Sequence, residues 1–282
     1  MQIIRSQAPL SALTISAYRT LIAAAVLVGV LVLLRRSREA VGVLRHHPVR
    51  TVLVGLGTGA YQALYFTSVV LVGVTVSTVV SLGLAPVLLS VGEAVRRRRA
   101  PAPGRVAGLL VALVGLVLVS TAGGLGDVGP HPGWGILAAV ASGSMYALAT
   151  ALGRPLAQQV NPLALTTATT TVGALALLPL GLLASRTGAL WSTDPVVIIT
   201  LAYLGVLTMA LAYALLYAGL RTTTGSAAVV ATLLEPVTAA VVAAVVLHER
   251  LGLAGVVGTV LILAAVVALG RGGPRSPASP SG

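Results

Sequence analysis

The sequence has no cysteine, no lysine, few charged side chains and few aromatic ones. Without cysteine, disulfide bonds, thiolate metal sites and thiol catalysis are excluded. Charged residues make up 9% of the chain and hydrophobic residues 57%. Soluble domains carry about 25% charged residues, so a soluble hydrophobic core does not fit this composition. We therefore expect an integral membrane protein whose partner is the lipid bilayer.

All 18 basic residues are arginines, and the formal net charge is +12. Such a charge could indicate nucleic-acid binding, but the arginines form short clusters between apolar stretches, as the positive-inside rule of membrane proteins predicts. We expect no nucleic-acid partner. The four histidines fit no metal-ligand spacing, and the sequence shows neither a nucleophile–base set nor a nucleotide-binding loop. We therefore expect no enzymatic activity, no cofactor and no metal site.

Nine stretches have the length that a helix needs to cross the hydrocarbon core, about 20 apolar residues. They are residues 13–34, 51–72, 74–95, 106–122, 134–152, 163–183, 196–220, 227–247 and 251–269. Arginine clusters after the first and third stretches place those two loops in the cytoplasm, with the short N-terminus outside. The Gly/Pro/Ser-rich residues 272–282 are expected to form a disordered cytoplasmic tail.

An internal repeat with an offset of 150 residues links the two halves of the chain. The matching pairs include Pro86/Pro236 and Gly108/Gly258 and, at an offset of 152, Tyr61/Tyr213 and Tyr65/Tyr217. Four consecutive arginines follow Pro86 at 96–99, but only one arginine follows Pro236 at the equivalent loop, as expected if the repeats have opposite orientations. Inverted repeats are the architecture of many secondary transporters. We expect an all-α polytopic membrane protein with two inverted helical repeats, divided at residues 1–126 and 127–271.

The motifs of both halves resemble the EamA branch of the drug/metabolite transporter superfamily. They are Tyr213-Ala-Leu-Leu-Tyr217, Leu234-Glu235-Pro236-Val237 and Gly258 in the second half, with Ala17-Tyr18-Arg19, Tyr61 to Ser68 and Ala85-Pro86 in the first. The resemblance implies ten helices in two five-helix repeats. Because Leu13 begins the second helix of the family pattern, about nine are expected here, with the first one lacking.

The resemblance also implies a function. It indicates a multi-pass secondary transporter of a bacterial inner membrane that moves a small polar, amino-acid-like metabolite outward by alternating access. Protons are the candidate coupling ion, and the resemblance is compatible with a homodimer. The alternative is an integral membrane protein that has lost transport or serves another role.

Glu235 is the leading candidate for a site residue. A charge at bilayer depth costs at least about 2.5–3.5 kcal/mol and is seldom present without a partner or a task. Thr232 is predicted to share its helix face, and Pro236 frees a backbone carbonyl beside it. Two interpretations remain open. Glu235 exchanges a proton or binds a substrate ammonium, or it is a buried neutral acid that only supports the proline kink.

Other candidates follow from the repeat and the resemblance. Pro86 and Pro236 are predicted to break their helices at equivalent depths, or only to kink them. The pairs Tyr61/Tyr65 and Tyr213/Tyr217 line a substrate cavity, or they sit at the membrane interface. Gln62 and Ser81 add polar lining, or they bond helices together. The resemblance gives Arg19 a pairing or gating role, and the alternative is that its side chain snorkels to the membrane surface.

Overall fold

The computed structural model describes residues 11–121, 130–184, 194–238 and 252–271, and within these ranges the only regular secondary structure is helical. The helices are α2 (Ala12–Leu33), α3 (Ser37–His46), α4 (Pro48–Val72), α5 (Val74–Arg97), α6 (Pro103–Thr121), α7 (Pro132–Gln159), α8 (Pro162–Ala184), α9 (Pro195–Gly205), the π-helix η2 (Val206–Leu211), α10 (Ala212–Gly219), α11 (Gly225–Thr232) and α13 (Leu253–Arg271). The predicted C-terminal tail at 272–282 lies outside the described residues.

The predicted apolar stretches coincide with helices throughout the described ranges, although the stretch 227–247 is described only to residue 238. Among the described residues, six helices are long and apolar enough to cross a membrane: α2, α5, α6, α7, α8 and the continuous run Pro195–Gly219 formed by α9, η2 and α10. The 25-residue α4 is long enough but does not reach the same hydropathy, since it carries glycines and polar side chains near its middle. An all-α polytopic membrane protein is confirmed.

Two local predictions are wrong. The loop predicted after the first stretch contains the short amphipathic helix α3, which ends one residue before α4 begins. The stretch predicted to end at residue 152 continues as helix, because α7 runs on past Pro155 to Gln159. Proline removes only one backbone donor, so a helix can pass through it when its neighbours absorb the kink.

The helices α6 and α13 show the inverted repeat most directly. Adding 150 to the bounds of α6, 103 and 121, gives the bounds of α13, 253 and 271. A Cβ atom on Gly108 would lie 3.1 Å from Leu269, and one on Gly115 would lie 2.8 Å from the carbonyl oxygen of Gly258. The later residue of α6, Gly115, contacts the earlier residue of α13, Gly258, and the earlier residue, Gly108, contacts the later one, Leu269. The repeat-equivalent helices therefore pack antiparallel.

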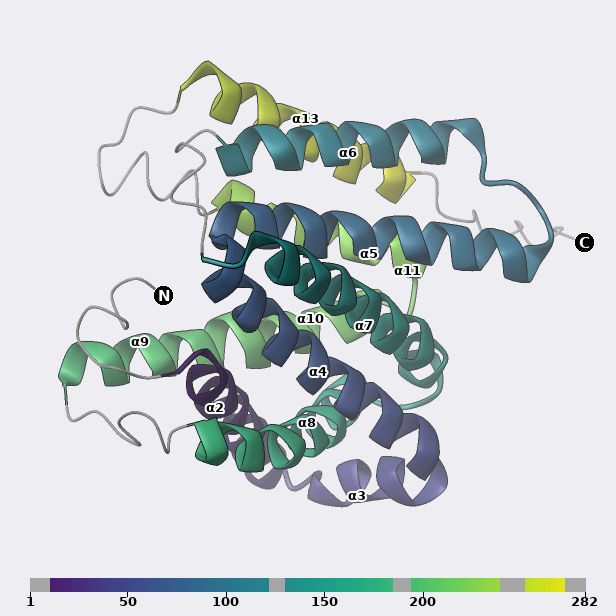
Figure 1. The fold of residues 1–282 in the computed structure, drawn as a ribbon. Coiled ribbons are helices and arrows are strands. Elements are labelled where there is room, and N and C mark those ends of the chain that lie inside the picture. Colours follow the sequence, from purple (N-terminus) through teal and green to yellow (C-terminus); the bar gives the residue numbers. More distant parts are fainter. Residues whose placement is uncertain (1–10, 122–129, 185–193, 239–251, 272–282) are drawn as a thin grey trace, which may run out of the picture.

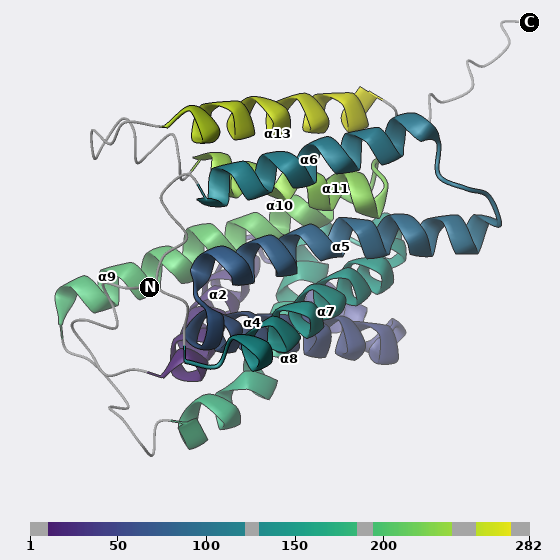
Figure 2. The same cartoon turned by 45° about the horizontal axis from the view of Figure 1, so that its top comes forward.

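Figure 1 shows α6 and α13 side by side along one edge of the bundle, with α5 and α11 beneath them. The view in Figure 2 keeps the same order, and α2, α4, α7 and α8 form the opposite part of the molecule. The run α9–η2–α10 passes between these parts, and α3 lies at the periphery beside α8 and α4.

Small residues allow the central helices to approach closely. A Cβ atom on Gly55 of α4 would lie 2.7 Å from the carbonyl oxygen of Thr169 in α8, and one on Gly143 of α7 would lie 2.6 Å from the carbonyl oxygen of Ser81 in α5. Without a hydrophobic driving force between helices in lipid, this backbone proximity supplies much of the attraction. Gly73 separates α4 from α5 with φ 95°, a conformation that favours glycine, and so turns the chain back on itself.

The repeat-equivalent prolines differ in their effect. The helix α5 is continuous through Pro86, so the predicted break there is wrong; the proline ring is buried and the helix keeps its bonds on either side. Near Pro236 the helix is interrupted at one residue, Leu233. The helix α11 ends at Thr232, where the Leu233 amide turns to the Val230 carbonyl at 3.0 Å, and helix resumes at Leu234. The missing amide of Pro236 leaves the Thr232 carbonyl without its helical donor.

Candidate functional site

Five tyrosines from three helices form one group, which we call the tyrosine cluster: Tyr61 and Tyr65 of α4, Tyr146 of α7, and Tyr213 and Tyr217 of α10. The rings of Tyr61 and Tyr146 stack with centroids 4.8 Å apart, and those of Tyr61 and Tyr65 are tilted with centroids 6.2 Å apart. The chain has only seven tyrosines. Gathering five of them inside the bundle indicates a common role and argues against placement at the membrane interface.

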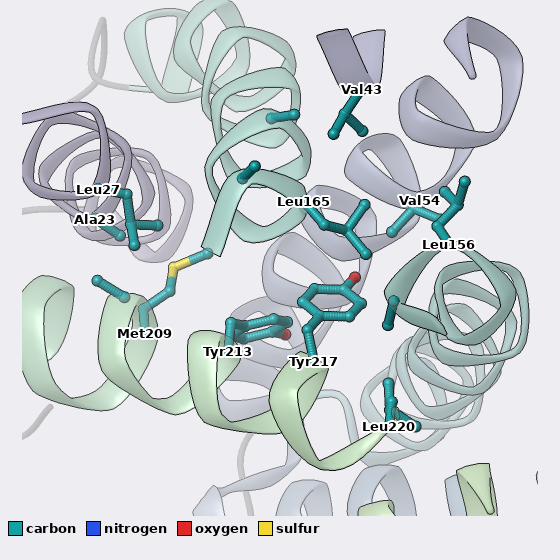
Figure 3. Packing of buried hydrophobic residues seen from close by; sticks show 14 of the residues in the cluster. Ala23, Leu27, Val43, Val54, Leu156, Leu165, Met209, Tyr213, Tyr217 and Leu220 are labelled. Atoms are coloured by element: carbon teal, nitrogen blue, oxygen red, sulfur yellow. The ribbon is translucent and has the colours of Figure 1, made fainter. Parts of the chain in front are cut away.

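The two tyrosines of α10 are fully enclosed by the bundle. Figure 3 shows Tyr213 and Tyr217 projecting from the same face of the helix, with Leu165 and Val54 beyond the Tyr217 ring. The Tyr217 hydroxyl lies within hydrogen-bonding reach of Thr58 and Thr169, and the Tyr213 hydroxyl reaches Gln62. Tyr61 and Tyr65 are half-buried and are therefore the more accessible members of the cluster.

Arg19 of α2 bonds the interior of the bundle and not the membrane surface, so the snorkelling interpretation is wrong. Its Nε donates to the Leu204 carbonyl at 3.2 Å and its Nη2 to the Thr208 carbonyl at 3.1 Å. Leu204 lies before the first residue of η2 and Thr208 lies after it. In this region π-helical hydrogen bonds replace those of an ordinary α-helix. Nη1 donates to Oε1 of Gln62 at 3.4 Å, and the guanidinium lies 5.7 Å from the Phe66 ring centroid. Arg19 thus connects the first repeat to the π-helix of the second.

Glu235 follows the turn at Leu233 and its side chain is exposed in the structure, so the burial predicted for it from the sequence is wrong. Glu235 lies three residues beyond Thr232, which is within hydrogen-bonding reach of the Tyr146 hydroxyl. Arg19 approaches the cluster from another element of the bundle, since it donates to Gln62. The cluster is therefore bordered by an acid from the second repeat and a base from the first.

Thr232 lies next to the cluster, because the Tyr146 hydroxyl is within hydrogen-bonding reach of it. The Thr232 hydroxyl itself donates to the Val229 carbonyl at 2.7 Å, in the last turn of α11. Pro236 is half-buried beside Glu235.

Ser81 and Pro86 are not brought to the cluster by any described contact. The Ser81 hydroxyl is fully buried and donates to the Ala139 carbonyl at 3.0 Å, which ties α5 to α7. This is the helix-bonding role that stood as the alternative for Ser81. Gln62, in contrast, contacts both Arg19 and Tyr213 and belongs to the cluster.

Sequence reasoning missed two parts of the site. Tyr146 lies in an Ala-rich stretch without a repeat partner, and the scarcity of aromatic residues is the only signal that could have found it. The π-helix η2 has no sequence signature, because one extra residue in a helical turn is visible only against a relative that lacks it. Among the described residues, no group of three histidine or carboxylate side chains is close enough to hold a metal ion.

Comparison with known proteins defines the class. The profile of the EamA-like transporter family matches residues 2–121 and again residues 133–271, one match to each repeat. The chain belongs to the EamA-like transporter family. It is 27% identical over 213 residues to the "Uncharacterized transporter YwfM" of Bacillus subtilis (strain 168), across 75% of this chain and 69% of that protein. A solved structure titled "Crystal structure of protein" shares the fold, with a TM-score of 0.75 and 21% identity over 92% of this chain and 88% of that one. The chain is thus a multi-pass membrane transporter by family.

Proposed function

We propose that this protein is a secondary transporter that moves a small polar, amino-acid-like metabolite out of the cell by alternating access of its two inverted repeats. The observation that carries the substrate class is that residues of opposite charge border the tyrosine cluster from different repeats, since Arg19 donates to Gln62 at 3.4 Å and Glu235 lies three residues beyond Thr232. An amino-acid-like zwitterion carries an ammonium and a carboxylate, and the two ends of the site carry the complementary charges.

The donors of Arg19 support this assignment. A guanidinium has five N–H groups, and three of them donate to described protein acceptors, the Leu204 carbonyl, the Thr208 carbonyl and Gln62. Two N–H groups are left for a substrate carboxylate, while the other three fix the orientation of the side chain. The rings of Tyr61 and Tyr65 offer an apolar face and a cation–π surface for the rest of the substrate.

Glu235 is proposed to bind either the substrate ammonium or a proton. An exposed carboxylate beside a helix break is accessible to both ligands, and only one of them can neutralise it at a time. Competition of this kind couples proton entry to substrate release. The outward direction and the bacterial cell membrane rest on the family and on the bacterial relative.

The test is flux in proteoliposomes with a panel of amino acids and related metabolites, with and without a pH gradient. Glu235→Gln keeps the shape and hydrogen-bonding capacity of the side chain but cannot titrate. We expect it to lose pH-gradient-driven transport and to retain some substrate exchange, whereas Glu235→Ala loses both. Glu39→Gln is the matched control, because it makes the same chemical change in α3, where Glu39 pairs with Arg36.

An unchanged pH dependence in Glu235→Gln would refute proton coupling through this residue. If the wild-type chain transports none of the compounds in the panel, the alternative of a membrane protein without transport activity is favoured.

A further inference from the structure

A second region of interest, which contains no residue of the tyrosine cluster, lies at the turn between α5 and α6. It is a cavity of about 200 Å³ lined by residues from the end of α5, the turn and the start of α6. The charged residues of the lining are Glu93, Arg97, Arg99 and Arg105. Figure 2 shows this turn at one end of the bundle, where α5 extends past its neighbours before the chain returns to α6.

The backbone of the turn divides the arginines into two sets. The helix α5 ends at Arg97, Arg98 takes a left-handed conformation with φ 50°, and the Arg99 amide donates to the Ala94 carbonyl at 3.2 Å. Arg97 and Arg99 line the cavity, whereas Arg96 and Arg98 do not. The left-handed conformation is unfavourable for a residue with a side chain, so glycine would be less strained at position 98 than the arginine that the sequence has there.

The one acid in the cavity already has partners. One Glu93 carboxylate oxygen accepts from Nη1 of Arg105 at 2.8 Å, and the other accepts from the Gly225 amide at the start of α11 at 3.0 Å. The Glu93 side chain is only 14% exposed. Its charge therefore fixes Arg105 and the first turn of α11, and the net positive charge of the cavity comes from Arg97 and Arg99.

We propose that this cavity binds a phosphate group, that of an anionic phospholipid headgroup in the membrane. Guanidinium groups hold phosphate through paired N–H donors. The cavity lies at the ends of two membrane-spanning helices, which is where lipid phosphates are found. Val95 and Val106 flank it and are among the exposed apolar side chains, so acyl chains have a surface to lie against. Soluble phosphate shares the same chemistry, and the experiment separates the two sources.

The experiment uses the purified full chain and two double variants that remove the same charge. Arg97→Gln with Arg99→Gln changes the cavity. Arg96→Gln with Arg98→Asn changes the neighbouring surface and leaves the cavity intact, and asparagine tolerates the left-handed conformation at 98. Retained phosphatidylglycerol is counted by native mass spectrometry, and inorganic phosphate binding to delipidated protein is measured by equilibrium dialysis. Circular dichroism verifies that every variant is folded.

We expect the cavity variant to retain phosphatidylglycerol about tenfold less than the control variant, with no inorganic phosphate bound by either. Inorganic phosphate binding with the same dependence on Arg97 and Arg99 would support the phosphate site and assign it to a soluble ligand. Equal losses in the two double variants, or no loss in either, would overturn the proposal, because nonspecific attraction to an anionic membrane does not distinguish between them.

Discussion

The contact between Arg19 and the π-helix predicts a specific loss when arginine is replaced by lysine. Lysine keeps the positive charge, but its ammonium is a point donor and does not present a rigid fork of N–H groups. The two carbonyls that Arg19 holds, those of Leu204 and Thr208, lie four residues apart along the helix. We expect a lysine side chain to keep one of these bonds and to lose the other.

The magnitude follows from the bonds that are lost. A hydrogen bond with a charged donor contributes about 1.5–3 kcal/mol. The Leu204 carbonyl also accepts from the Thr208 hydroxyl at 2.7 Å, so it remains satisfied without Arg19. We therefore expect Arg19→Lys to lower the free energy of unfolding by about 1.5–2 kcal/mol, the lower end of that range, and Arg19→Gln to lower it by roughly twice as much.

The assay is unfolding in mixed micelles of mild and denaturing detergent, followed by circular dichroism. Arg45→Lys is the matched control, because Arg45 is an exposed residue of α3 and its replacement should change stability by less than about 0.5 kcal/mol. Hydrogen exchange gives a local measurement: amides between 204 and 212 should exchange faster in Arg19→Lys and not in Arg45→Lys. Equal stability and equal exchange in the two variants would refute the role of Arg19 as a clamp on η2.

Two further predictions concern the packing and the topology. Gly115→Ala places a methyl group 2.8 Å from the Gly258 carbonyl oxygen and should lower the free energy of unfolding by about 1–3 kcal/mol. Gly29→Ala meets nothing within 4 Å and should be neutral or stabilising by up to about 1 kcal/mol; equal effects in the same unfolding assay would contradict the close approach of α6 and α13. A reporter fused after Arg99 should be cytoplasmic and one fused after Gly126 external, and finding both on the same side would refute the predicted topology.

The spanning helices could be predicted because their signals are local and redundant. Apolar length gives their approximate positions, and prolines mark several starts: α4, α6, α7, α8 and α9 each begin at a proline, at Pro48, Pro103, Pro132, Pro162 and Pro195. Proline suits the first helical position, where its missing amide has no intrahelical acceptor. The amphipathic α3 was missed because a search for apolar length passes over a short helix rich in arginine.

The site was only partly predictable, for a different reason. Glu235 and the tyrosine pairs stand out in the sequence because their residue types are rare in it. Whether Glu235 is buried depends on which helices cover it, and that is a tertiary property without a local signal. The same holds for Arg19, since its partners Leu204 and Thr208 are about 190 residues away and act through backbone carbonyls, which every residue has.

The two charged candidates of the site show how a symmetric scaffold carries an asymmetric function. The helices α2 and α8 begin 150 residues apart, at 12 and 162, so the repeat equivalent of Arg19 is Thr169. Thr169 lies near Tyr217, while Arg19 clamps the π-helix that precedes Tyr213 in the chain. The equivalent of Glu235 is Ala85, which is fully buried.

Each charge is therefore present in one repeat only, and the charges come from opposite repeats. The backbone contacts of α6 with α13 retain the twofold relation, as the proposed alternating access would require. A zwitterionic ligand has no twofold symmetry, so a site that orients it must break the symmetry of the repeats. In the proposed function, Arg19 and Glu235 supply that difference at two positions, so we expect their replacement to change the coupling and selectivity of transport more than replacement of any residue shared by both repeats.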